Sequence, residues 1–114
     1  MVKHLGLYGE GNRPIPAIDE AVVVFMVNKS LPAGSWAGKW TDQQVYEATR
    51  CSWVVGAKVR ELAVYALGVQ HGVVRGAYRI DSWYPDRPRR WCFEGTPAPE
   101  LGAVGTSYEL LKAS

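Results

Sequence analysis

The sequence AVVVFMVN, residues 21–28, is the strongest strand signal in the chain. It is a continuous apolar run, rich in β-branched residues, and it has the length of a single strand. Such a run predicts a central strand that is buried on both faces. The polar triplet Asn28-Lys29-Ser30 ends it, and the Gly- and Pro-containing segment LPAGSWAGKW, residues 31–40, predicts a loop.

A helix is predicted after this loop. The run Thr41-Asp42-Gln43-Gln44 matches a capping box, with Thr41 as N-cap and the Gln44 side chain reaching back to its N–H. The helix is expected over residues 42–51, with Val45 and Ala48 on its inner face. A further helical turn is expected over residues 58–63.

The second half of the chain carries further strand signals. Residues 64–69 and 73–80 read as two strands joined at Gln70-His71-Gly72, which predicts a hairpin. Residues 81–90, with two prolines, predict a polar loop, and residues 91–94 predict another strand. Thr106 and Glu109 form a second capping-box pattern and predict a short C-terminal helix.

This order, β-α-β-β-β-α, is mostly antiparallel and indicates a small α+β domain. The expected architecture is a closed or half-open β-barrel with flanking helices. A chain of 114 residues predicts one domain. Residues 1–20 contain glycines and prolines without periodicity and are expected to form an irregular N-terminal arm, so the domain itself is expected over residues 21–114.

The composition is that of an ordinary globular protein, with 47% hydrophobic and 21% charged residues and a net charge of +2. No apolar run approaches the roughly 20 residues of a membrane span, and the start, MVKHLGLYGEGN, has no signal-peptide core. These features predict a cytoplasmic protein with no membrane contact. Cys51 and Cys92 are therefore expected to be reduced thiols.

Tryptophan and charge are distributed unevenly. The chain has five tryptophans against only two phenylalanines, which favours roles for a flat π face or an indole N–H besides bulk. Residues 58–90 hold seven basic and three acidic side chains, so this stretch has a charge of +4 and the rest of the chain −2. This asymmetry is typical of a surface with one basic face.

Several chemistries are disfavoured by the residue patterns. No pair among His4, His71, Cys51 and Cys92 has metal-finger or CxxC spacing. Cys51 falls at a helix C-terminus, where the helix dipole disfavours a thiolate, and no nucleophile elbow or phosphate-binding glycine loop occurs. The chain is therefore expected to be no enzyme and to bind no metal or cofactor.

The remaining polar and aromatic residues suggest a binding site. Trp53 follows the first helix and Trp83 lies in the basic loop, so the two rings can sandwich a planar base. Asn28, Lys29 and Ser30 can bind the edge of that base. The arginines expected to pair with phosphates are Arg50, Arg87, Arg89 and Arg90. Arg50 has an alternative partner in Glu47 on its own helix.

The same order of features resembles the PUA-like superfamily, and within it the YTH and EVE domains, which read modified bases. YTH domains have a Lys-Ser at the end of the first strand and close the next helix with Gly-x-Trp, here Cys51-Ser52-Trp53. The resemblance implies that Lys29, Ser30, Trp53 and Trp83 occupy pocket positions. Residues 45–80 are also similar to the domain that follows the nuclease module in some bacterial GIY-YIG proteins, although the chain has no GIY-YIG motif.

The expected function is therefore recognition of a modified or flipped-out base of DNA or RNA in an aromatic cage, without catalysis. The second cage ring is Trp83 or, alternatively, Trp91, for which core packing is the other interpretation. A nuclease acting in trans is one expected partner, and the chain is expected to be a monomer or a homodimer. The alternative function is a protein-interaction or small-ligand module that uses exposed tryptophans, Trp36 and Trp40 among them, as anchors.

Overall fold

The computed structural model describes residues 18–31 and 40–112. In chain order the elements are β1 (Val22–Met26), α1 (Asp42–Arg50), α2 (Ala57–Leu62), β2 (Tyr65–Gln70), β3 (Val73–Arg87), β4 (Arg90–Pro97), the 3-10 helix η3 (Pro99–Leu101) and α3 (Tyr108–Lys112). Most of the predicted N-terminal arm, and Trp36 with most of its loop, lie outside the described residues.

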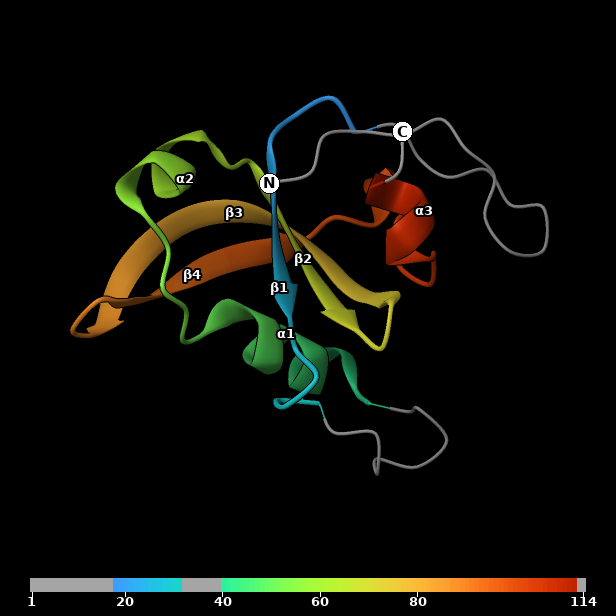
Figure 1. Ribbon diagram of the computed structural model, residues 1–114, viewed down its shortest axis with the longest axis horizontal. Coiled ribbons are helices and arrows are strands. Elements are labelled where there is room, and N and C mark those ends of the chain that lie inside the picture. The colour runs from blue at the N-terminus through green and yellow to red at the C-terminus, as the bar shows by residue number, and fades with distance from the viewer. Residues whose placement is uncertain (1–17, 32–39, 113–114) are drawn as a thin grey trace.

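The four strands form one open, mixed sheet in the order β1-β2-β3-β4 (Figure 1). β1 runs parallel to β2, whereas the β2–β3 and β3–β4 pairs are antiparallel. The prediction of a small, mostly antiparallel α+β domain is therefore confirmed. In the described part of the chain β1 and β4 are the two edges of the sheet, so these strands do not close into a barrel.

β1 is an edge strand, so its predicted central position is wrong, but it is buried on both faces as expected. Val22 packs into one core cluster and Val23 and Phe25 into the other, on opposite sides of the sheet. One cluster lies under α3 and the C-terminal segment. The other cluster lies under α1 and α2. Each face of the sheet is therefore covered by at least one helix.

Helix α1 begins with the predicted capping box. Gln44 N donates to Thr41 Oγ1 over 3.1 Å, and Thr41 N donates to Gln44 Oε1 over 2.8 Å. The helix buries Val45, Ala48 and Thr49 against the sheet. It approaches β2 closely because residue 68 is glycine: a Cβ there would lie 2.3 Å from Thr49 Oγ1.

The predicted β2–β3 hairpin is confirmed. His71 and Gly72 both have positive φ, 48° and 77°, which is the conformation of a two-residue type I′ turn. The backbone N–H of Tyr108 donates to Gly72 O over 2.8 Å, so the start of α3 is docked on this turn.

β3 continues well beyond the predicted strand. Residues 81–87, expected to be loop, extend the strand to Arg87, and β4 returns antiparallel from Arg90. The register shifts near Ile80 and again near Pro85, and this long hairpin bends across the left of Figure 1. Its turn has Pro88 followed by Arg89 with φ 66°, the pattern of a type II turn.

The prediction of a second capping box is wrong in detail. Thr106 Oγ1 donates to Ala103 O over 2.6 Å instead of capping the helix. Ser107 takes that position, because Leu110 N donates to its hydroxyl over 3.4 Å. The short C-terminal helix itself, α3, is confirmed.

Candidate functional site

The polar triplet after β1 lies in an exposed turn. Asn28 Oδ1 accepts a hydrogen bond from His71 N over 2.9 Å, so this side chain holds the β2–β3 turn. Ser30 lines a pocket between this turn and α1, together with Trp40 and Cys51. Lys29 is exposed. The structure therefore brings one residue of the predicted triplet to a pocket, and that pocket contains neither Trp53 nor Trp83.

Trp53 is held firmly against the core. Its ring stacks on Phe25, with the ring centroids 4.7 Å apart, and its Nε1 donates to Thr49 O over 2.7 Å. Its backbone also pairs with that of Trp91 through two hydrogen bonds of 3.0 and 2.8 Å. One face of the Trp53 ring is thus covered by Phe25.

Trp83 joins the same aromatic cluster from β3. Its ring contacts the Phe93 ring edge-on, with the ring centroids 5.7 Å apart. The Phe93 ring in turn packs against the Phe25 ring, with the centroids 6.3 Å apart. The two tryptophans are thus linked through Phe25 and Phe93, and no ring contact joins them in the described part of the chain. They are half-buried partners of one core cluster rather than the two faces of a sandwich.

Trp91 is half-buried at the start of β4, so the expectation of simple core packing is wrong for it. The guanidinium of Arg60 from α2 lies over its ring, 3.8 Å from the centroid. This is a close cation–π contact. One face of the Trp91 ring is therefore covered by the Arg60 guanidinium.

Arg50 is largely occupied by partners inside the protein. Its guanidinium pairs with Glu47 at 3.1 Å and with Glu94 at 3.0 Å, and it also donates to the hydroxyl of Tyr84. Burial lowers the pKa of Arg50, but Tyr84 and the two carboxylates outweigh it and raise the pKa, so the charge is retained. This arrangement matches the alternative pairing with Glu47 and leaves little of the charge for a phosphate.

The other predicted phosphate-binding residues, Arg87, Arg89 and Arg90, lie together at the turn of the β3–β4 hairpin and are called the arginine tip. All three are exposed. Arg90 Nη1 donates to Ser52 O over 3.0 Å, and Arg87 meets the neighbouring Asp86 at 3.7 Å. The tip therefore presents an excess of positive charge to solvent.

A disulfide bond lies behind the arginine tip. It joins Cys51, at the end of α1, to Cys92 of β4, and the two residues are 41 positions apart in the sequence. The expectation of two reduced thiols is therefore wrong for this structure. The bond connects α1 to the strand that carries the tip, beside the backbone bridge between Trp53 and Trp91.

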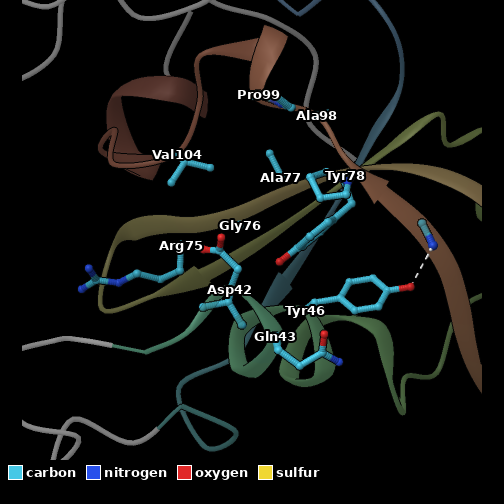
Figure 2. Close-up of a pocket in the computed structure, with 13 residues that line it drawn as sticks. Asp42, Gln43, Tyr46, Arg75, Gly76, Ala77, Tyr78, Ala98, Pro99 and Val104 are labelled. Carbon is cyan, nitrogen blue, oxygen red and sulfur yellow. Dashed lines mark hydrogen bonds between the residues drawn. The ribbon is translucent and has the colours of Figure 1, made fainter.

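A second pocket lies at the other end of β3, and the sequence interpretation missed it (Figure 2). β4 pairs with β3 only as far as the Tyr78–Pro97 pair, after which the chain turns into η3. The start of β3 is bonded there to the chain that follows β4, since Ala98 N donates to Ala77 O over 2.9 Å and Val74 N donates to Thr106 O over 3.0 Å. This α1–β3 pocket has a volume of about 410 Å³, and it is lined by Asp42, Gln43, Val45, Tyr46, Arg75, Gly76, Ala77, Tyr78, Gly95, Pro97, Ala98, Pro99 and Val104.

The two tyrosines of this pocket differ in their partners. Tyr46 Oη accepts from Gly95 N over 3.0 Å and contacts Glu94 Oε2 at 3.3 Å. Figure 2 shows the first of these bonds and the Tyr78 side chain pointing from β3 toward α1. Burial, Asp42 and Tyr46 together raise the pKa of Tyr78 well above its ordinary value, so its hydroxyl keeps its proton.

Among residues 18–31 and 40–112, no three His, Cys, Asp or Glu side chains gather in a way that could hold a metal ion. No helix in the same part of the chain is long and apolar enough to cross a membrane. No protein-family model matches the chain, and neither a curated protein nor a solved structure is significantly similar to it.

Proposed function

We propose that the protein is a non-catalytic nucleic-acid-binding module that contacts backbone phosphates with its arginine tip. The observation that carries this proposal is the gathering of three exposed arginines at one hairpin turn, where Asp86 is the one carboxylate among the described residues that forms an ion pair with them. Arginine is well suited to this role because its planar fork binds phosphate oxygens in a bidentate manner. Such contacts position a nucleic acid without reading its sequence.

Base recognition is the finer part of the proposal. Trp91 lies beside Arg90, and its ring face already holds one planar group, the Arg60 guanidinium. An unstacked base of DNA or RNA has the same flat shape and can replace the guanidinium on the ring. Each such stack contributes about 1–3 kcal/mol, the size of the cost of flipping a base. We therefore favour Trp91 over Trp83 as the ring that meets the base.

The likeness to PUA-like domains, YTH and EVE domains among them, belongs to this proposal. The order of a strand ending Asn28-Lys29-Ser30, a capped helix, Trp53 and a hairpin supports it, and a modified base and a nuclease acting in trans are the ligand and partner that it suggests. A cytoplasmic location stays a prediction. The disulfide bond between Cys51 and Cys92 argues against a reducing compartment, because such bonds persist mainly where the surroundings are oxidising.

Binding of fluorescent oligonucleotides at several salt concentrations tests the proposal. Single- and double-stranded DNA and RNA are compared by anisotropy, with and without a modified base. We expect the logarithm of the affinity to fall linearly with the logarithm of the salt concentration. Replacing both Arg87 and Arg89 with Gln is expected to reduce that slope by about 0.7–0.9 for each phosphate that the variant no longer neutralises.

Lys112→Gln is the matched control, because it removes one exposed positive charge from α3, on the opposite side of the molecule (Figure 1). It is expected to leave both affinity and slope unchanged. The proposal is overturned if no oligonucleotide binds, or if Lys112→Gln weakens binding as much as the double arginine variant does.

A further inference from the structure

We propose that the α1–β3 pocket is a separate binding site for a mononucleotide, that is, a planar heterocycle carrying an anionic group. This goes beyond the proposed nucleic-acid binding, because the pocket and the arginine tip are at opposite ends of β3. From Tyr78 to the tip the strand runs for about 30 Å at the usual rise per residue. The alternative function of small-ligand binding is thus proposed for a site distinct from the arginine tip.

Tyr78 brings a hydroxyl group to the pocket. Its side chain is 5% exposed, and its hydroxyl lines the pocket without a hydrogen bond to any described residue. The hydroxyl oxygen itself stays accessible to solvent, so it can exchange water for a ligand. It can donate to the hydrogen-bonding edge of a ligand or accept from it.

The walls of the pocket suit a flat, largely apolar body. The ring centroids of Tyr46 and Tyr78 are 5.2 Å apart. Ala77, Pro99 and Val104 also line the pocket (Figure 2). Gly76 lets the Tyr78 side chain pack directly against β3, since a Cβ there would lie 2.6 Å from Tyr78 Oη. A volume of about 410 Å³ is in the range of pockets that hold small molecules.

One acidic and one basic side chain lie at the rim of the pocket. Asp42 at the start of α1 offers a carboxylate, which can accept from an exocyclic amino group of a base. Arg75 uses its Nε to bind Gln70 Oε1 at 3.1 Å and meets no carboxylate in the described part of the chain. Its guanidinium lies toward Trp40, away from Tyr78, so it can pair with an anionic group such as a phosphate only where that group extends from the pocket to the rim.

Titrations with the four common ribonucleoside monophosphates, followed by calorimetry, test this site, and the corresponding nucleosides serve as the uncharged arm. At least one nucleotide is expected to bind. Tyr78→Phe removes only the hydroxyl and is expected to weaken binding about fivefold to tenfold. Tyr108→Phe makes the same chemical change on α3, outside the pocket, and is expected to have no effect.

Two further variants test the shape and charge of the site. Val104 is 50% exposed at the pocket wall, so Val104→Trp can fill the pocket without disturbing the core and is expected to lower the affinity more than tenfold. Arg75→Gln is expected to weaken nucleotide binding and leave nucleoside binding unchanged.

The proposal is overturned if no nucleotide or nucleoside binds, or if Tyr78→Phe and Val104→Trp bind like the wild type. Equal affinity for nucleotides and nucleosides contradicts the anionic part of it. The double variant of Arg87 and Arg89 is expected to bind nucleotides normally. A failure of oligonucleotide binding and a failure of the pocket therefore give different results.

Discussion

The two halves of β3 are parts of one strand in very different surroundings. The inner half, residues 73–80, lies between two core clusters, and Val74, Ala77 and Tyr78 are buried there. The outer half, residues 81–87, has no buried residue and leads to the arginine tip. We infer that the inner half, together with the rings of the core cluster that Trp83 joins, carries the stability of the domain, whereas the arginine tip at the end of the outer half carries contacts to an external polyanion.

The largest expected effect falls on the ring that closes the core beneath α1. Phe93 is fully buried and contacts Phe25, Tyr46, Tyr78 and Trp83. Phe93→Ala is expected to lower the free energy of unfolding by about 3–5 kcal/mol in urea denaturation. Arg87→Ala at the tip is expected to change it by less than about 0.5 kcal/mol. Equal losses for the two variants would contradict the assignment of stability to the buried core and not to the arginine tip.

Reduction of the disulfide bond is expected to have the next largest effect. Because the Cys51–Cys92 bond closes a long loop, its loss is expected to cost about 2–4 kcal/mol of stability. The measurement is urea unfolding with and without dithiothreitol. A variant with Ser at both positions serves as the control, since its midpoint should not respond to the reductant. An unchanged midpoint for the reduced wild type would show that the bond contributes nothing.

The close contact between α1 and β2 is tested at a glycine. Gly68→Ala places a methyl group against Thr49, and we expect a loss of about 1–3 kcal/mol from overpacking. Gly56→Ala adds the same methyl group at a position with no atom within 4 Å, so it should be nearly neutral. Circular dichroism during thermal unfolding measures both. If the two variants melt at the same temperature, the helix is not in such close contact with the sheet.

The smallest expected effect is on the free energy of unfolding, from a variant at the arginine tip that should change stability and binding in opposite directions. Arg89 has φ 66°, a conformation that costs a non-glycine residue about 1 kcal/mol, so Arg89→Gly is expected to raise stability by up to about that amount. The same variant should weaken oligonucleotide binding, because it removes a tip charge. Arg87→Gly, at an ordinary strand position, should lower both stability and binding. A drop in stability for Arg89→Gly would contradict the turn geometry.

The inner half of β3 could be predicted from the sequence, and the outer half could not. Apolar alternation and the His71-Gly72 turn are local signals, as is the capping box at Thr41. Residues 81–90 contain two prolines and several charged residues, a composition that predicts a loop. Their backbone nevertheless pairs with β4, because an exposed two-stranded hairpin does not need an apolar pattern. The signal for the strand lay in the type II turn at Pro88-Arg89.

The surroundings of the predicted site residues depend on contacts between distant parts of the chain. Trp53 stacks on Phe25, 28 positions earlier in the sequence, and no local pattern could show that one face of its ring is covered. The Cys51–Cys92 bond joins residues on separate elements for the same reason. The α1–β3 pocket is lined by residues of α1, β3, β4 and the segment that follows β4, so it is a property of the tertiary structure.

The location of the nucleic-acid contact tests the central claim most directly. A ¹⁵N-labelled sample is titrated with an oligonucleotide that binds, and amide and indole signals are followed by NMR. We expect the largest shifts at Arg87, Arg89, Arg90 and the indole N–H of Trp91, with little change at Gly76 and Ala77 in the pocket. Shifts centred on the pocket, or none at the arginine tip, would contradict the account.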